Sequence, residues 1–471
     1  MNTKALRQKV LDLAIHGKLV PQNPNDESAT VLLEKIRAEK AEKIKKGELK
    51  ADKKDSFIFV GSDKRHYEQF ADGSVKDIED EIPFEVPEGW TWCRLGNIGK
   101  WQSGTTPNKK NLDYYKNGTI PWLLTGDLND GLVTEIPNCI TEKALKETSL
   151  KINPIGSVCI AMYGATIGKL GILNTPATTN QACCVCYEFY GINNKYLFYF
   201  LKEHKEEFIQ QGFGGAQPNI SKEKIVDTFI PLPPLSEQEC IVKSIETYFE
   251  QIDSLEENKY DLQTAIKQAK SKILDLAIHG KLVPQNPNDE PAEELLKRIA
   301  TSDNRPYEKV ESSEIDWTLP NNWCLCHFGD IATVINGKNQ SKVENPNGKY
   351  PIYGSGGIMG RADDYICPEN CTIIGRKGSI NNPIFVEEKF WNVDTAFGLC
   401  PSEAILPKFL FYFCEYFDFT TLDSSTTLPS LTKTNIQQII FALPPIEEQK
   451  RILDKTVELF GKLDEIVLNL V

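Results

Sequence analysis

Seventeen consecutive residues occur twice in this chain, and this duplication constrains the fold more than any other feature. LDLAIHGKLVPQNPNDE spans Leu11–Glu27 and again Leu274–Glu290, an offset of 274 − 11 = 263. Two weaker repeats have other offsets: PEGWTWCRLGNI returns as PNNWCLCHFGDI, and LPPLSEQECI returns as LPPIEEQKRI. Self-similarity of this kind indicates a duplicated architecture.

The offsets predict where the two copies join. If the LPP repeat keeps its offset of 443 − 232 = 211, Val471 lies opposite Tyr260, and at the offset of 263 Met1 lies opposite Thr264. Only the residues 261–263 then lack a counterpart. We therefore expect two copies of one unit, joined within a helix, in a pseudo-twofold circular arrangement with adjacent termini.

Apolar residues between Ile241 and Leu276 recur in alternating steps of four and three, with Lys259 as the one break, which is typical of a long helix packed on another along one stripe. This heptad seam consists of Ile241, Ile245, Tyr248, Ile252, Leu255, Leu262, Ile266, Ala269, Ile273 and Leu276. By symmetry its partner is a helix assembled from both ends of the chain, which makes the pair antiparallel. An ordinary amphipathic helix packed on its own domain stays an alternative.

Helix-end signals flank this seam. Ser236 and Glu239 match a capping box at its start, and Gly280 is expected to end the helix. The 44 residues 237–280 would span about 66 Å at about 1.5 Å per residue.

Two segments of different character lie between the helical regions. They are rich in Gly, Asn, Thr and aromatic residues, and short apolar runs in them are bounded by turn residues, which predicts mixed α and β domains with strand-rich cores. The expected fold class is α+β, with two such domains joined by a long antiparallel helical coiled-coil pair. The expected divisions are the N-terminal part of the helix at 1–27, a charged linker at 28–86, the first domain at 87–235, the central helix at 236–290, a second linker at 291–318, the second domain at 319–446 and the C-terminal helix at 447–471.

The formal net charge of −13 sets a condition on nucleic-acid binding, because phosphate contacts need Lys and Arg. Seven acids and two bases in 237–259 give −5, whereas eight bases and six acids in 100–181 give +2. A DNA-binding chain of this kind would rely on partner subunits for much of the neutralisation.

Composition also bears on location and metals. No apolar run could span a membrane and no secretory signal is visible, so we expect a cytoplasmic protein. The 13 cysteines are then expected to be thiols rather than disulfides, and none has paired C-x-x-C zinc spacing.

In this order and duplicated, the motifs resemble the specificity subunit of type I restriction-modification systems. The resemblance covers essentially the whole chain. It is carried by the repeated helix end, by the GW and NW sequences that begin the domains, by GTTP, IPWLLTGDL, GATIGKLGI and QPNIS in the first domain, and by both LPP plus EQ endings.

The resemblance implies a non-catalytic subunit that acts in DNA modification and phage defence. In that family, two target-recognition domains alternate with conserved helical regions; each domain would read one half of a bipartite, asymmetric double-stranded DNA target, and the helices would fix the spacer. Two modification subunits, which methylate adenine with S-adenosylmethionine, and restriction subunits, which translocate and cleave DNA with ATP, are the implied partners. No cofactor is expected in this chain; S-adenosylmethionine, ATP and Mg would act in the partner subunits.

Base reading needs hydrogen-bonding side chains on loops backed by a rigid core. Arg376 and Lys377 are the strongest candidates, because flanking glycines let the backbone approach phosphate while one side chain reaches a base edge. Each candidate could instead be a solvated turn residue, and Trp391, Asp394 and Phe397 are expected to pack in the core. The candidates are Gln102, Ser103, Thr105, Thr106, Lys109, Lys110, Tyr163, Thr166, Lys169, Asn180, Gln181 and Gln217 in the first domain, and Asn336, Lys338, Asn339, Gln340, Tyr353, Ser355, Arg376, Lys377 and Ser379 in the second.

Enzyme motifs fail on spacing. GATIGKL has three residues between its glycines and Leu after Lys, whereas a phosphate-binding loop needs four and then Ser or Thr. NNPIF departs from the Asn-Pro-Pro-aromatic motif of adenine methyltransferases. Two alternatives stay open: a coiled-coil scaffold that binds only proteins, and a DNA enzyme with an unrecognised site.

Overall fold

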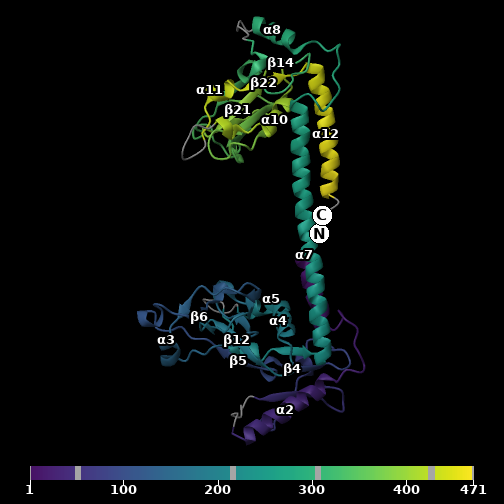
Figure 1. Cartoon of the computed structure of the whole chain (residues 1–471), viewed down its shortest axis with the longest axis vertical. Coiled ribbons are helices and arrows are strands. Elements are labelled where there is room, and N and C mark those ends of the chain that lie inside the picture. Colours follow the sequence, from purple (N-terminus) through teal and green to yellow (C-terminus); the bar gives the residue numbers. More distant parts are fainter. Residues whose placement is uncertain (1, 48–54, 213–218, 303–308, 423–429, 469–471) are drawn as a thin grey trace. The chain divides into compact units, whose positions relative to one another are not determined.

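The computed structural model describes residues 2–47, 55–212, 219–302, 309–422 and 430–468. The chain divides into two compact units, unit 1 (1–257) and unit 2 (258–471), and the division falls within the long helix α7 (Leu235–Ile278) (Figure 1). Each unit combines helices with sheets, which confirms the α+β class. Met1 and Val471, whose proximity the duplication predicts, lie outside the described residues.

Unit 1 begins with two helices and a small sheet, and then forms a strand-rich domain. Its elements are α1 (Thr3–Ile15), α2 (Ala29–Lys45), β1 (Ser56–Val60), β2 (His66–Phe70), β3 (Val75–Asp77), β4 (Thr91–Arg94), β5 (Gly99–Ser103), β6 (Ile120–Leu123), β7 (Gly131–Val133), β8 (Cys139–Ile140), α3 (Glu142–Glu147), β9 (Val158–Ala161), β10 (Leu170–Leu173), β11 (Thr178–Thr179), β12 (Cys183–Phe189), α4 (Asn194–Glu203), α5 (Lys205–Gly212), α6 (Lys222–Val226), β13 (Phe229–Leu232) and the first part of α7.

Unit 2 begins in α7 and ends in another long helix. Its further elements are α8 (Ala292–Ser302), β14 (Cys324–His327), α9 (Phe328–Ile331), β15 (Ala332–Asn336), β16 (Tyr350–Gly354), β17 (Gly357–Ala362), β18 (Cys371–Gly375), β19 (Ile384–Val386), β20 (Trp391–Asn392), β21 (Ala396–Pro401), α10 (Pro407–Tyr416), α11 (Lys433–Gln437), β22 (Ile440–Leu443) and α12 (Ile446–Leu468).

The sheets of the two units share one topology, although the domain sequences differ. The largest sheet has the order β5-β12-β9-β10-β7 in unit 1 and β15-β21-β18-β19 in unit 2. A strand pair in each unit joins the Trp-containing start of the domain to the strand before the LPP turn, β4 with β13 and β14 with β22. The duplication therefore includes the domains as well as the helices.

Each LPP turn is followed by a glutamine that is fully buried and fully used. Gln238 accepts a hydrogen bond from the Asn193 backbone N–H at 2.7 Å and donates to the carbonyls of Gly191 and Pro233. Gln449 makes the same bonds with Leu406, Ala404 and Pro444. The amide ties the start of each helix to the start of α4 or α10, so the helix and the domain share one core.

The glutamate before each glutamine is buried as well. The Trp90 indole N–H donates to Glu237 at 3.0 Å, and Gln22 from the repeated segment donates to its other carboxylate oxygen at 3.3 Å. Burial raises the pKa of Glu237, against the two donors that lower it. In unit 2 burial likewise raises the pKa of Glu448, which accepts from Gln285 at 2.7 Å.

Glycine ends the repeated helix for two physical reasons. Gly17 and Gly280 have φ of +64° and +65°, and the next backbone N–H closes a bond back to Leu13 or Leu276 at 2.8 Å. A Cβ at Gly17 would lie 2.3 Å from the Pro87 ring, and one at Gly280 would lie 2.6 Å from Pro320. Both the left-handed backbone and the close approach exclude a side chain.

Within unit 1, α1 runs antiparallel to the first part of α7. Arg7 pairs with Glu256 at 3.0 Å and with Asp253, whereas Gln22 reaches Glu237 at the other end. Within unit 2, the second part of α7 runs antiparallel to α12, since Lys270 pairs with Asp464 and Gln285 with Glu448.

The heptad seam describes α7 only in part. Ile241, Ile245, Ile252 and Ile266 are buried, but Tyr248 and Leu255 are 45% and 46% exposed. Near the C-terminus of the helix the most buried residues are Leu274, Ala277 and Ile278 rather than the predicted Ile273 and Leu276. Tertiary packing on each domain, rather than a uniform helix-helix stripe, sets the burial.

Several sequence-based expectations differ from the structure. The second linker, expected at 291–318, contains α8. Residues 28–86, expected to be a charged linker, contain α2 and the three-stranded sheet β1–β3, because apolar residues of α2 pack on the domain; residues 48–54 of this segment lie outside the described part. Ser236 does not begin α7 but donates to Asp26 from its first turn. Cys371 and Cys400, on neighbouring strands, form a disulfide.

The buried glutamine gives a stability prediction. Gln238→Leu should lower the free energy of unfolding of unit 1 by about 2–4 kcal/mol, because it leaves three buried backbone groups without their partner. Urea denaturation followed by tryptophan fluorescence measures the change. The neighbouring exposed position supplies the control: Glu239→Leu should change the free energy by less than about 0.5 kcal/mol, and equal losses in the two variants would contradict the proposed role of the amide.

Candidate nucleic-acid interface

In the first domain, four loops meet at one edge, around residues 179–183. Backbone hydrogen bonds join Thr105 to Thr179 at 2.9 Å, Gly104 to Cys183 at 3.2 Å and Met162 to Ala182 at 2.8 Å. The segment after residue 218 joins them, since the Ile220 N–H donates to Met162. Seven predicted residues therefore come together from separate parts of the sequence: Gln102, Ser103, Thr105, Thr106, Tyr163, Asn180 and Gln181.

Several of these side chains hold one another in place. Gln102 donates to Asn153 at 2.6 Å, the Thr105 hydroxyl lies 2.8 Å from that of Ser149, and Thr106 bonds to Gln181. Tyr163 is 38% exposed, and Ser103 and Gln181 are exposed. The cluster thus has the fixed geometry that reading of base edges requires, with some donors and acceptors still facing solvent.

The remaining first-domain candidates lie differently. Lys109 and Lys110 are exposed on the loop after Pro107. The Lys169 ammonium donates to the Leu128 carbonyl at 3.2 Å, and the Thr166 hydroxyl donates to the Tyr163 carbonyl at 3.1 Å, so both side chains have local structural roles. Gln217 lies outside the described residues.

In the second domain the corresponding loops meet around residues 392–396. The backbone N–H groups of Gly337 and Lys338 donate to the carbonyls of Ala396 and Asn392, and the Arg376 backbone N–H donates to the Thr395 carbonyl at 2.8 Å. Val393 donates to the Tyr353 carbonyl at 3.0 Å. The predicted residues from three loops are thereby brought together, with Gln340, Tyr353 and Ser355 half-buried and the others exposed: Asn336, Lys338, Asn339, Arg376, Lys377 and Ser379.

Two buried aromatic side chains support this cluster. Trp391 is buried and donates to the Lys338 carbonyl at 2.9 Å, and buried Phe397 lies 5.8 Å from the Arg376 guanidinium. Burial, reinforced by Glu388, raises the pKa of Tyr353, which keeps its hydroxyl protonated as a donor. Asp394, expected in the core, is exposed, because it lies in the turn between β20 and β21.

Two lysines at this edge of the first domain were not predicted from the sequence. Lys151 and Lys222 line the polar depression that Gln102, Ser103 and Thr105 share with Ser149 and Asn153. Lys222 is the first residue of α6, and Lys433, at the LPP offset of 433 − 222 = 211, is the first residue of α11. A cation at a helix N-terminus opposes the helix dipole, so its recurrence indicates a role outside the helix. The repeat ISK and LTK was the available signal.

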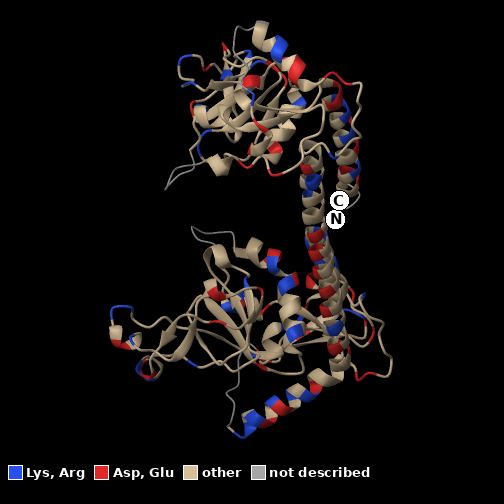
Figure 2. Ribbon diagram, turned by 45° about the horizontal axis from the view of Figure 1, so that its top comes forward, with Lys and Arg blue, Asp and Glu red and all other residues tan. Residues whose placement is uncertain are grey.

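In the described part of the chain, Lys and Arg alternate with Asp and Glu along α2 and the long helices (Figure 2). Among the residues that the structure describes, no group of three or more His, Cys, Asp or Glu side chains is arranged to hold a metal ion. No helix in the described ranges is long and apolar enough to cross a membrane. The side chains that the converging loops present are hydrogen-bonding and basic groups.

Comparisons with known proteins agree on one family. The family model for the type I restriction modification DNA specificity domain matches residues 87–263 and 320–465. The type I restriction enzyme EcoAI specificity subunit of Escherichia coli is 26% identical over 98% of this chain and 90% of its own length. The MjaIX specificity subunit of Methanocaldococcus jannaschii is 29% identical over 57% of this chain and 58% of its own length.

Solved structures show the same fold. A chain from a structure of type I R-M complex assembly and conformational transition aligns with a TM-score of 0.58 at 18% identity, covering 82% of this chain and 94% of its own. The HsdS subunit from Thermoanaerobacter tengcongensis aligns with a TM-score of 0.52 at 17% identity, over 82% and 92%.

The paired lysines give a prediction specific to phosphate contact. Lys222→Gln or Lys433→Gln should weaken duplex DNA binding by the chain in its assembled complex and reduce the slope of log K against log salt by about 0.9 each. Binding measured by fluorescence anisotropy at several salt concentrations tests this. Lys224→Gln, where the ammonium donates to the Gln211 carbonyl instead, is the control and should keep the slope. A slope that does not change in either lysine variant would rule out the contact.

Proposed function

The chain belongs to the type I restriction-modification DNA specificity family, and on that premise we propose how its parts divide the recognition of DNA. It is a non-catalytic subunit that supplies DNA sequence specificity to a restriction-modification complex. Each domain reads one half of a bipartite target: the first domain, 87–235, through the loops around 179–183, and the second, 319–446, through those around 392–396.

The observation that carries this proposal is the matched architecture with unmatched loops. The two domains share sheet topology, and the same loops converge beside β12 and β21. The side chains on equivalent loops differ: Met162 and Tyr163 follow β9 in the first domain, whereas Arg376 and Lys377 follow β18 in the second. Equal scaffolds with unequal hydrogen-bonding groups suit a target whose two halves have different sequences.

The helices are proposed to fix the spacer between the half-sites. α7 is continuous over 44 residues, or about 66 Å at about 1.5 Å per residue. The antiparallel contacts of α1 and of α12 with α7 inside the respective units support a coiled-coil pair in a pseudo-twofold, circular arrangement. Two DNA-binding domains joined by a stiff helix can contact the DNA grooves only at a fixed separation, and successive turns of DNA are about 34 Å apart.

Exposed apolar residues on these helices support the docking of partner subunits. Tyr248 and Leu255 on α7 in unit 1 and Val457 and Ile466 on α12 in unit 2 are all more than two-fifths exposed. Two modification subunits, matched to the two repeated segments, are the proposed occupants, with restriction subunits added through them in the cytoplasm. S-adenosylmethionine, ATP and Mg²⁺ would act in those partners.

Sequencing of adenine methylation tests the proposed function. Co-expression of the chain with its modification subunit should methylate one split motif, because each domain contributes one half. The modification subunit expressed alone is the control and should give no such motif. An assembled complex that leaves DNA without a split methylated motif would favour the protein-binding scaffold.

A segment exchange tests the division between the domains. Replacing residues 87–235 with the corresponding segment of a relative should change one half of the methylated motif and leave the other half and the spacer unchanged, because the helices and the second domain are retained. Methylation sequencing of the chimera is the measurement, and the reciprocal exchange of 319–446 is its control. A change in both halves from either exchange would contradict modular reading.

A further inference from the structure

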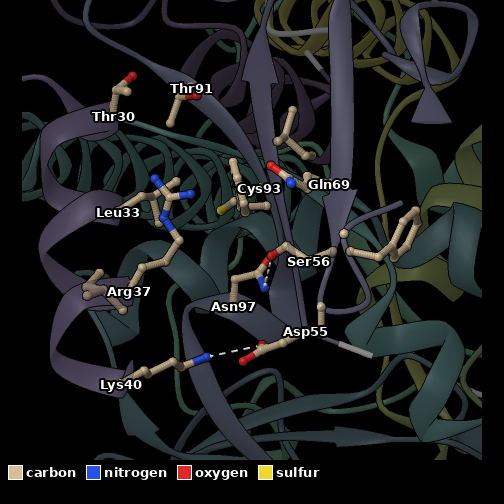
Figure 3. Close-up of a pocket in the computed structure, with 16 residues that line it drawn as sticks. Thr30, Leu33, Arg37, Lys40, Asp55, Ser56, Gln69, Thr91, Cys93 and Asn97 are labelled. Atoms are coloured by element: carbon tan, nitrogen blue, oxygen red, sulfur yellow. Dashed lines mark hydrogen bonds and ion pairs between the residues drawn. The ribbon is translucent and has the colours of Figure 1, made fainter. Parts of the chain in front are cut away.

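A cavity of about 370 Å³ lies in unit 1 (Figure 3), and none of its lining residues belongs to the converging loops. Its walls are α2 on one side and the strands β1 and β2 on the other, and β4 with Asn97 forms its floor. This volume falls at the lower end of the range of small-ligand sites, about 300–1,000 Å³.

Apolar residues form about half of the cavity lining. Leu33 and Ile36 of α2 and Phe57 and Ile58 of β1 line the cavity, and all four are only half-buried. The Cys93 thiol on the floor is buried, and burial raises its pKa, so it stays a neutral, apolar surface. An apolar body in the cavity would cover surface that the fold leaves partly open to water.

Two cations from α2 give the cavity a positive character. The Arg37 guanidinium lies 3.9 Å from the centre of the Phe57 ring and reaches toward the middle of the cavity, opposite Gln69 and Asn97 (Figure 3). The Lys40 ammonium lies 3.6 Å from Asp55, the one acidic residue of the lining. Two bases against one acid leave +1, in a chain whose formal net charge is −13.

The second copy of the duplicated unit shows that the scaffold does not need this cavity. α8 repeats α2 at the offset of 263, so Leu33 and Ile36 become Leu296 and Ile299, but Arg37 becomes Ala300. In unit 2 Leu296 is 2% exposed and Ile299 packs on the core with Val310 and Ile315.

The small sheet is also particular to the first copy. Between α8 and β14, the described residues form only one short 3-10 helix, Ser312–Glu314, where unit 1 has β1–β3. In unit 2 this face of α8 packs on the core. In unit 1 the same face of α2 borders the cavity, carries Arg37 and Lys40, and lies opposite the added sheet. The proposed DNA reading and the attachment of the helices, which would be common to both copies, do not account for this difference.

We propose that the cavity binds a small organic anion, with its apolar body between α2 and β1 and its acidic group at Arg37. Charge-assisted hydrogen bonds to a guanidinium are suited to a carboxylate, sulfonate or phosphate ester. The site is independent of the proposed DNA-reading loops, and its test needs no DNA.

The dye 1-anilinonaphthalene-8-sulfonate, an aromatic anion of suitable size, serves as the probe. Fluorescence titration of the full chain should show a saturable site that Ala71→Trp, at the exposed rim of the cavity, removes. Arg37→Gln should weaken binding about five- to tenfold, the effect of one partly solvated charge-assisted bond. Lys43→Gln, a base of α2 outside the lining, is the matched control and should leave binding unchanged.

An uncharged dye separates the charge from the apolar surface. N-phenyl-1-naphthylamine lacks the sulfonate, so its binding should also be lost in Ala71→Trp but should change less than about twofold in Arg37→Gln. Sulfonate binding that survives Ala71→Trp would overturn the site. An equal loss of both dyes in Arg37→Gln would overturn its assignment to anions.

Discussion

A glutamine amide buried at the start of each long helix is the contact on which the rest of the structure depends. Gln238 and Gln449 each satisfy three backbone groups of their own domain. The adjoining carboxylates of Glu237 and Glu448 accept from the repeated segment through Gln22 and Gln285. Helix, domain and repeated segment therefore meet at adjacent polar contacts in each unit, made by two neighbouring buried side chains of the long helix.

That network explains why the sequence repeats where it does. Letter-for-letter identity is confined to the segment that ends the helix, passes the glycine and supplies the glutamine. The domains need only keep strands that can pair, so their sequences have diverged while β5, β9, β10 and β12 keep the order of β15, β18, β19 and β21. Identity follows the close polar contacts, and divergence follows the loops that face outward.

The duplication made the two-unit plan, the α+β class and the ends of the helices accessible from sequence. Local patterns were less informative where tertiary contacts decide the outcome. Ser236 has the spacing of a cap, yet its hydroxyl bonds to Asp26 across the fold. The loop candidates were found because polar residues between glycines follow predicted strands, but Lys169 turned out to support a backbone carbonyl. Lys222 was missed because an isolated lysine has no pattern until the second copy is aligned with it.

An unbroken α-helix between two reading domains has a consequence for how such chains can change. Each residue added to α7 would advance the downstream part by about 1.5 Å and turn it by about 100°. Most insertions would therefore rotate the second domain away from the DNA groove. Insertions close to a whole number of helical turns would keep its orientation and change only its distance from the first domain. On the proposal that α7 fixes the spacer, the screw symmetry of the helix would limit the target spacings to a discrete series.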